Sequence, residues 1–456
     1  MNPKIQSGKF RRWAARLSAG VFGLLVVIPL ATLRPVDRAD WSTIDPVDDA
    51  VQIAKTIYND LSDLKSSPLE SGWAALPLTT GAGMPLAGYG ARQGAPSTGG
   101  GERLFAKALF LRNGTAEVSI VTADILLVHA GVAEAVLENC ADAGIAPESI
   151  YFTATHTHCG PGGWGPNLIE ESVCGPFEPQ RVATLAQDLS RTIIAARDAA
   201  APAEWSWLET SAPEYLRNRT VKGGSTDPVL EALAVRLSDS GQIGVFAFFG
   251  AHVTCMGSDQ MSFHADYPGF FVREMEKEAV AFAAFGSASV GSQSPVGDGQ
   301  KEDRARNIGV GLAGKLLPEL QTAQWKADIA LGSARRTVPL PKFQIRVSGD
   351  IRVSQWLAKR LHADTAPIHF VHLDNRRLVG LPVEYSALLS APLREEAKDH
   401  GIEVTPTAFN GDYIGYVLPP EIYDNGAYET RMNFLGPGGG AYFTKLIKVG
   451  LGMEKP

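Results

Sequence analysis

Two histidines stand where residue type and spacing favour chemistry, in the run Thr155-His156-Thr157-His158-Cys159-Gly160-Pro161-Gly162-Gly163. The run follows a β-branched, aromatic segment, residues 150–154, and opens a loop rich in glycine and proline. Side chains two apart in a strand point to the same face, so a strand would present both imidazoles together at its end. Such a pair could bind a metal, or bind it with one ring and move a proton with the other. Two ordinary histidines at a polar strand end are the alternative, and spacing alone does not separate the two interpretations.

Four further residues follow strand-like runs or lie in loops, where chemistry is common. His252 comes directly after an apolar run rich in phenylalanine, as His156 does, and Glu384 follows another apolar run. Tyr416 is the second of two tyrosines three apart in the loop Asn410-Gly411-Asp412-Tyr413-Ile414-Gly415-Tyr416. Ser294 lies in Gly291-Ser292-Gln293-Ser294-Pro295, which is not the Gly-x-Ser-x-Gly elbow of serine hydrolases. Each of these residue types is more often structural than functional when it stands alone.

The elements that must position these residues alternate between strands and helices. A hairpin is predicted from residues 104–112 and 116–127 around Asn113-Gly114. Further strands are expected at 149–154, 229–237 and 244–249, and helices at 131–140, 181–199 and 269–282. This alternation predicts an α/β fold: a large mixed-sheet domain with flanking helices.

The N-terminus has the pattern of a membrane address. An uncharged run, residues 17–33, follows five basic residues, namely Lys4, Lys9, Arg11, Arg12 and Arg16. No Ala-x-Ala site closes the run, so an uncleaved signal anchor is favoured over a cleaved peptide. The rest of the chain is then expected outside the cytoplasm, periplasmic or extracellular, or secreted if the segment is cleaved. Residues 1–38 are interpreted as basic segment and anchor, 39–72 as a stalk or capping helix, and 73–456 as the main domain.

The composition limits the kinds of partner that the chain could bind. The chain has 456 residues, of which 45% are hydrophobic and 20% charged, as in ordinary folded proteins. The formal net charge of −7 and the lack of a basic face exclude a nucleic-acid partner. Four cysteines are too few for a disulfide framework, although Cys159 and Cys174 could pair in an oxidising compartment. Nothing in the sequence indicates the oligomeric state.

Taken together, these motifs resemble the neutral (non-lysosomal) ceramidase family in its catalytic domain, over about residues 78–443. The most specific motif is the Thr-His-Thr-His-x-Gly-Pro-Gly-Gly run. In that family two histidines, a glutamate and a tyrosine hold one zinc. The resemblance implies that Zn²⁺ is the cofactor and that its ligands are His156, His252, Glu384 and Tyr416. Nitrogen and oxygen ligands of this kind suit zinc and leave a position open for water.

The resemblance also implies roles in catalysis. His158 matches the histidine that takes a proton from the zinc-bound water and returns it to the leaving amine. Arg219 matches an arginine that steadies the oxyanion, and Tyr428 a tyrosine beside the scissile amide. Ser294 matches a family serine that is either a nucleophile or a group that binds the substrate's hydroxyl. The second role is favoured because a metal-bound hydroxide already supplies a nucleophile.

The family pattern is not matched everywhere. Val383 replaces a glycine before Glu384, the Ser294 motif lacks its acidic neighbour, and the run Gly99-Gly100-Gly101-Glu102-Arg103 lacks a histidine. We expect a membrane-anchored zinc amidohydrolase that cleaves the N-acyl bond of ceramide or a ceramide-like lipid. The alternatives are a zinc hydrolase of a different amide or ester, and a non-catalytic binding protein with the same fold.

Overall fold

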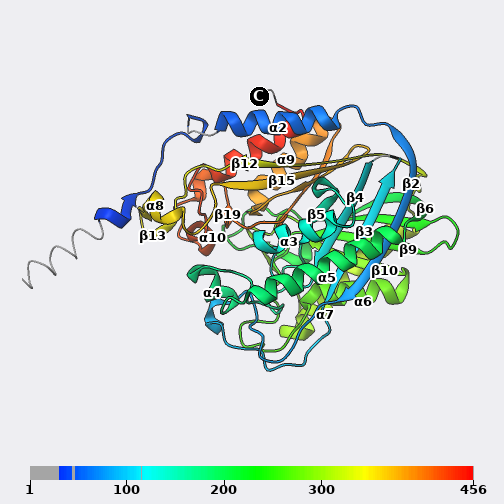
Figure 1. Ribbon diagram of the computed structural model, residues 1–456, viewed down its shortest axis with the longest axis horizontal. Coiled ribbons are helices and arrows are strands. Elements are labelled where there is room, and N and C mark those ends of the chain that lie inside the picture. The colour runs from blue at the N-terminus through cyan, green and yellow to red at the C-terminus, as the bar shows by residue number, and fades with distance from the viewer. Residues whose placement is uncertain (1–29, 44–46, 115, 455–456) are drawn as a thin grey trace, which may run out of the picture.

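The computed structural model describes residues 30–43, 47–114 and 116–454 (Figure 1). Most of the predicted signal anchor, residues 17–29, lies outside the described residues. Across the part of the chain that is described, no helix has both the length and the apolar character needed to cross a bilayer.

A single twelve-stranded sheet is organised around strand β2 (Ser66–Pro77), which pairs with three neighbours and divides the sheet into three branches. The first branch contains β3 (Phe105–Asn113), β4 (Ala116–Ala123) and β5 (Ile150–Phe152). The second contains β6 (Ala201–Ser211), β8 (Val229–Leu237), β9 (Ile243–Phe249) and β10 (Phe282–Ser287). The third contains β12 (Asp328–Pro339), β15 (Thr365–Leu373), β16 (Arg376–Gly380) and β18 (Glu403–Thr407).

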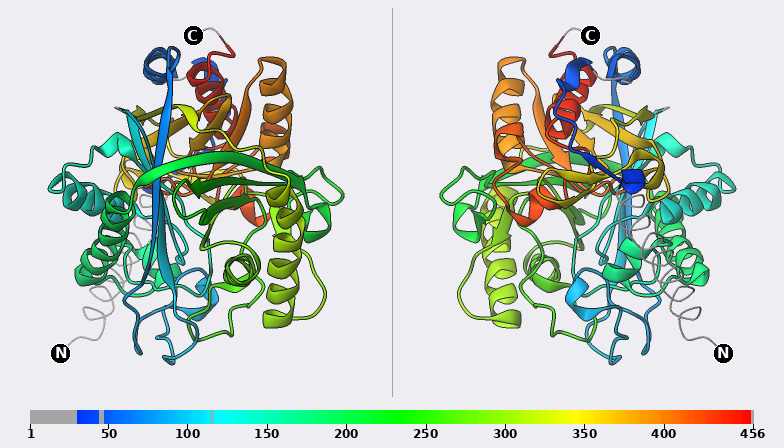
Figure 2. Two further views of the ribbon diagram at one scale, coloured as in Figure 1. Left: turned by 90° about the vertical axis from the view of Figure 1, so that its right-hand side faces the viewer. Right: turned by 90° about the vertical axis from the view of Figure 1, so that its left-hand side faces the viewer.

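Helices cover the outer face of each branch, so the molecule has three helix–sheet cores around a central one (Figure 2). Helices α3 (Ala130–Ala141) and α5 (Pro179–Asp198) pack on the first branch. The second is covered by α6 (Asp266–Glu278) and α7 (Lys301–Gln321). The third is covered by α2 (Val47–Leu61), α9 (Ala387–Asp399) and α11 (Gly439–Gly450). Leu109, Phe246 and Val371, one from each branch, belong to the central core.

Short elements complete the fold and carry much of the site. A three-stranded sheet joins β1 (Leu33–Pro35), β14 (Ile351–Val353) and β13 (Arg346–Ser348). Two small pairs are β7 (Leu216–Asn218) with β11 (Gln293–Pro295), and β17 (Glu384–Tyr385) with β19 (Tyr416–Val417). The short helices are α4 (Leu168–Cys174), α8 (Gln355–Ala358) and α10 (Tyr428–Arg431).

The mixed sheet with flanking helices is confirmed, because β4–β5, β9–β10 and β16–β18 are parallel whereas the other pairs of the large sheet are antiparallel. The predicted hairpin is also confirmed, as β3 and β4 pair antiparallel. The helix expected over 269–282 is shifted: α6 ends at Glu278, and Phe282 already belongs to β10. All six residues of β10 are buried beside β9, and this burial fixes the segment as a strand.

Helix α2 lies against the domain. Its apolar stripe, which includes Ala50, Ala54 and Ile57, is fully buried in the same core as α11 and the third branch. The domain start expected at Trp73 falls inside strand β2.

A buried ion pair ties α9 to the second branch, and its loss should destabilise the fold. Arg394 Nε lies 3.0 Å from Asp227 Oδ2, and its Nη2 lies 2.9 Å from Glu231 Oε2. Arg394→Leu would remove the buried positive charge that lies against both buried carboxylates, so we expect the free energy of unfolding to fall by about 3–5 kcal/mol in denaturant titration. Arg306→Leu, which breaks an exposed pair with Glu302, should cost about 1 kcal/mol or less. Equal losses in the two variants would contradict this assignment.

Candidate active site

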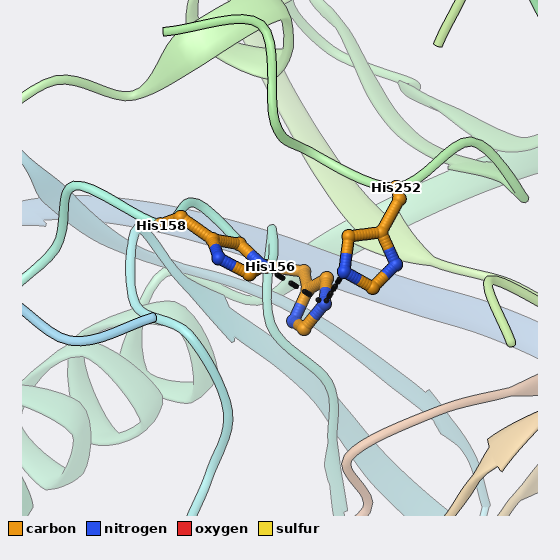
Figure 3. Close-up of side chains that lie close together, drawn as sticks. All are labelled: His156, His158 and His252. Carbon is orange, nitrogen blue, oxygen red and sulfur yellow. Dashed lines mark hydrogen bonds between the residues drawn. The ribbon is translucent and has the colours of Figure 1, made fainter. Parts of the chain in front are cut away.

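Three buried histidines meet at one point, each a few residues beyond the end of a strand (Figure 3). His156 and His158 follow β5, and His252 follows β9. Nε2 of His156 lies 3.0 Å from Nε2 of His252 and 3.4 Å from Nε2 of His158. Within the described residues, this is the one group of three histidine, cysteine or acidic side chains close enough together to share a metal ion.

The two motif histidines meet through a turn, and the strand alternation predicted for them is wrong. Strand β5 ends at Phe152, four residues before His156. His156 has a φ of +66°, the left-handed region that non-glycine residues rarely adopt. Its backbone N–H donates to the carbonyl of Ile125, 3.1 Å away, which holds the turn in place. Such backbone strain in a buried residue is typical of functional sites.

The surroundings of His156 fix which of its nitrogens can bind a ligand. Nδ1 donates to the carbonyl of Leu126 at 2.7 Å, because a carbonyl can only accept. Nε2 therefore carries the free lone pair, and it faces the other two rings. The ring stacks on Phe409 at 4.4 Å, and burial lowers the pKa of His156 to about 3, so the imidazole is neutral near pH 7.

Glu384 brings a carboxylate to the same point. Its side chain is 2% exposed, with Oε2 3.4 Å from His252 Nδ1 and Oε1 4.0 Å from His156 Nε2. Tyr413 donates its hydroxyl to Oε1 at 2.9 Å, and the β17–β19 register sets Tyr416 beside Glu384. Burial raises the pKa of Glu384 to about 7, even though the charge of Arg219 opposes the shift.

These residues fit a metal cation. Two buried atoms beside the cluster have no hydrogen-bond partner: His252 Nδ1 and Glu384 Oε2. Buried polar atoms are nearly always paired, so unpaired acceptors at one point indicate a missing positive charge. Burial also lowers the pKa of His158 and His252 well below the ordinary value, which keeps both rings neutral, the form that binds metals.

Arg219 and two tyrosines form one wall of the site. The Arg219 side chain donates from Nη2 to the Tyr416 hydroxyl at 3.3 Å, and its Nε lies 2.5 Å from Glu429 Oε1. The Tyr428 ring centre lies 5.9 Å from that of Tyr416, and Tyr428 is 60% exposed at the pocket rim. The structure thus brings both of these predicted residues, Arg219 and Tyr428, to the cluster.

Above the cluster is a pocket with mostly apolar walls. The histidines, Glu384, Tyr413 and Tyr416 lie among its lining residues. The apolar lining comes from separate segments of the chain and includes Leu127, Val173, Phe343, Leu361 and Phe434. A ligand here would meet polar chemistry at one place and hydrocarbon elsewhere.

Ser294 lies outside the lining of the pocket and, unlike Arg219, has no hydrogen bond among the described residues to one that lines it. It lies in β11, and its hydroxyl accepts a hydrogen bond from Arg217 Nε at 3.3 Å. Antiparallel pairing of β11 with β7 sets Ser294 opposite Arg217. The lining of the pocket does not include it.

Ser294→Ala should therefore have little effect on activity. We expect kcat/KM to stay within about threefold, the change that a surface substitution of ~0.5 kcal/mol produces. Steady-state kinetics of the purified variant measure this. A loss as large as that of a pocket histidine variant would put Ser294 back among the catalytic groups.

Three residues of the site were not assigned from the sequence. Tyr413 was noted only as one of two tyrosines, and Glu429, which holds Arg219, was not singled out. Gly88 has a φ of +120°, and a Cβ there would lie 2.6 Å from the His158 ring. The sequence shows a glycine in the loop after Pro85. It does not show that this glycine packs against His158, which lies 70 residues further along the chain.

The cysteine pairing considered from the sequence is not formed. All four cysteines are free and buried. Cys159 Sγ accepts from Arg92 Nη2 at 3.4 Å, and Cys174 Sγ contacts the carbonyl of Gly175 at 3.9 Å. Arg92 also donates to the carbonyl of His158 at 2.5 Å, so this guanidinium supports the histidine loop in place of a disulfide.

Sequence comparison decides the family. The profile of the family described as "Neutral/alkaline non-lysosomal ceramidase, N-terminal" matches residues 79–307. This chain belongs to the neutral/alkaline non-lysosomal ceramidase family. The matched segment contains all three histidines and Arg219. Glu384 and Tyr416 of this ceramidase-family chain lie beyond the matched segment, so their place in the site comes from the structure.

Related proteins agree with this assignment. A protein named "Neutral ceramidase" from Mycobacterium tuberculosis is 26% identical over 244 residues, which cover 47% of this chain and 38% of that protein. The chain therefore matches well under half the length of this curated relative. The neutral ceramidase of Pseudomonas aeruginosa has the same fold, with a TM-score of 0.74 at 20% identity over 86% of this chain and 75% of that chain. A ceramidase structure described as complexed with C2 has a TM-score of 0.73 at 19% identity over the same shares.

Proposed function

We propose that this chain is a zinc-dependent amidohydrolase that cleaves the N-acyl bond of ceramide or a ceramide-like lipid. One observation carries the proposal: neutral histidines and a carboxylate, with unpaired buried atoms, converge in a pocket with apolar walls. Membership of the ceramidase family and a relative named neutral ceramidase support the same reaction.

His156, His252 and Glu384 would hold the zinc, with Tyr416 beside Glu384 as the fourth group. When bound, Zn²⁺ supplies a Lewis acid that polarises a carbonyl and lowers the pKa of water. The chain contributes neutral imidazoles, a carboxylate that ionises near neutral pH, and a wall that excludes bulk solvent.

His158 would move the proton. Its ring lies against His156 and Tyr89, with the ring centre of Tyr89 at 4.8 Å, and its Nδ1 has no partner among the described residues. A neutral imidazole so placed can accept a proton from the attacking water and donate it to the leaving amine. Gly88, Tyr89 and the carbonyl contact from Arg92 hold this ring in one orientation.

Arg219 and the tyrosines would bind the amide. The Arg219 guanidinium is held by Glu429 and hydrogen-bonds the Tyr416 hydroxyl. Its N–H donors therefore lie at the edge of the three-histidine cluster. Fixed donors of this kind stabilise the oxyanion that forms as the carbonyl is attacked. Tyr428, at the rim, would contact the substrate beside the scissile bond. The apolar walls would hold hydrocarbon chains, which is why we favour a lipid amide over a polar one.

The proposal for location rests on the sequence. We propose that residues 1–38 anchor the chain and that the catalytic domain lies outside the cytoplasm, because five basic residues precede an uncharged run.

Hydrolysis of a fluorescent N-acylsphingosine by the purified full chain tests the activity. Release of sphingosine that depends on added zinc is expected, with little release from an N-acyl amino acid or a fatty ester of equal chain length. Equal or greater turnover of the ester would favour a different hydrolase. No turnover of any of the three by zinc-loaded protein would leave a binding protein as the better interpretation.

Zinc affinity should fall with acidity because Glu384 must lose a proton to bind. In the metal-free protein the pKa of Glu384 is about 7. Below that pH, zinc must displace a proton from the carboxyl group; above it, the group is already ionised and no proton is released. Apparent affinity should therefore drop by about tenfold for each pH unit below ~7 and change little above it. The histidines contribute no slope there, since their pKa values are well below 6.5. Competition titrations with a chromogenic chelator measure this, and a flat profile down to about pH 5.5 would contradict it.

A further inference from the structure

Exposed apolar side chains gather on one face of the molecule. Nine large hydrophobic residues are exposed in the described part of the chain. Seven of them line the pocket, as Ile169 and Tyr428 do, or lie on α4 and on the β1–β14–β13 sheet with its adjoining turn and helix α8. The seven are Leu30, Leu168, Ile169, Val347, Ile351, Trp356 and Tyr428. The other two, Tyr58 and Val310, lie on helices α2 and α7. Single exposed apolar residues are normal, but a cluster at a pocket mouth indicates a binding surface.

Two ledges form this face, one on each side of the mouth. The first is helix α4, where Leu168 is 82% exposed and its neighbour Ile169 lines the pocket. The second is the β1–β14–β13 sheet with helix α8, where Trp356 is 50% exposed. A hydrogen bond from Asn167 Nδ2 to the Leu361 carbonyl, 3.2 Å long, joins the ledges, and Leu361 also lines the pocket. In Figure 1 the N-terminal turn lies next to α8 at the left of the molecule, and α4 lies lower down on the same side.

We propose that this face, defined by Leu30, Leu168, Ile351 and Trp356, docks on a lipid bilayer. Docking there would set the pocket mouth against the membrane, so that a lipid could enter without crossing water. The binding itself does not depend on the catalytic proposal.

The chemistry of the second ledge favours lipid. Trp356 donates its indole N–H to the Ala31 carbonyl at 2.9 Å, and the Arg360 guanidinium lies 5.4 Å from the ring centre. An indole flanked by cations is the combination found where proteins meet the headgroup layer. Arg34, which donates to backbone carbonyls, adds a second positive charge to this ledge, whereas Lys359 is paired with Asp364 at 2.7 Å. On α4, Glu170 and Glu171 are turned inward, to His129 at 3.3 Å and to the Phe177 amide at 3.1 Å.

The chain itself leads to the same place. Residues 1–29, which precede the described part, join it at Leu30, directly beside Trp356. Their sequence carries five basic residues and then most of the uncharged run that ends at residue 33. A segment with membrane character therefore enters the fold at the exposed face, which favours a bilayer over a protein partner as the occupant.

Environment-sensitive labels on the full chain test the proposal. The native cysteines are buried, so Leu168→Cys and Trp356→Cys can be labelled with the fluorophore NBD, with Val310→Cys as the matched exposed control. On vesicles of phosphatidylcholine with phosphatidylglycerol we expect the first two labels to brighten severalfold, shift to the blue and be quenched by nitroxide lipids. The control label should not change.

Three results would overturn the proposal. The first is that the chain does not sediment with the vesicles. The second is that it sediments while all three labels stay in water, so that only the N-terminal segment binds. The third is that the labels are already shielded without vesicles, so that the chain's own segment or a second copy covers the face. A kinetic readout separates docking from catalysis. Leu168→Ser with Trp356→Ser should lower turnover of vesicle-embedded ceramide severalfold and leave a micelle-dispersed short-chain analogue unaffected.

Discussion

Glu384→Gln is expected to abolish zinc binding and hydrolysis together. Among the acidic residues that the structure describes, Glu384 is the one that contacts the three-histidine cluster, and it is 2% exposed, so water cannot replace it. The amide keeps the volume and can still accept from Tyr413, so the fold should be retained. Substituting a residue that only hydrogen-bonds a metal ligand lowers metal affinity about 10–100-fold. Loss of a ligand itself should therefore lower zinc affinity by at least ~100-fold. Zinc titration and kcat/KM should fall in parallel.

A second carboxylate in the same pocket provides the control. Glu170 lines the pocket but lies 3.3 Å from His129, away from the cluster. Glu170→Gln should keep one zinc and most of the activity. If this variant loses zinc as completely as Glu384→Gln does, the effect is a general loss of pocket structure and the assignment of Glu384 fails.

His158→Ala is expected to keep the zinc and lose the activity. A positioned general acid–base contributes about 10²–10⁴-fold to rate, and kcat should fall by that amount. His158 is nonetheless part of the three-histidine group, with Nε2 3.4 Å from Nε2 of His156, so the geometry also allows it to bind metal. Metal content of the variant separates these roles. One zinc per chain supports proton transfer, whereas loss of zinc would make His158 a ligand.

His129→Ala is the matched comparison, because this histidine lines the same pocket without joining the cluster. It should retain both zinc and kcat. Recovery of His158→Ala activity by added imidazole would show that the variant lost its proton-transfer group and not the packing of the pocket.

Local sequence patterns predicted the strands and the histidines well. The apolar runs before His156 and His252 do form buried strands, β5 and β9, and the residues after them do enter one site. The mixed sheet could be predicted because alternating strand and helix patterns are local. The family resemblance added Glu384 and Tyr416, which periodicity alone left undecided.

Other features depend on contacts between distant segments. Each branch of the sheet contributes to the site: His156 and His158 follow β5, His252 follows β9, and Glu384 follows β16. That convergence follows from the three partners of β2, which no local pattern encodes. The left-handed turn at His156 likewise requires the carbonyls of Ile125 and Leu126 from a neighbouring loop. Ser294 matches the family motif, but its hydroxyl bonds Arg217, and the strand pairing that sets this contact is not visible in the local sequence.

The location of bound metal tests the central claim most directly. Crystals of the full chain grown with zinc, with anomalous diffraction recorded on both sides of the zinc absorption edge, would locate the ion. We predict one strong peak per chain, in contact with His156 Nε2, His252 and Glu384. A zinc-loaded protein with no peak at this cluster, or with its peak elsewhere, would contradict the account.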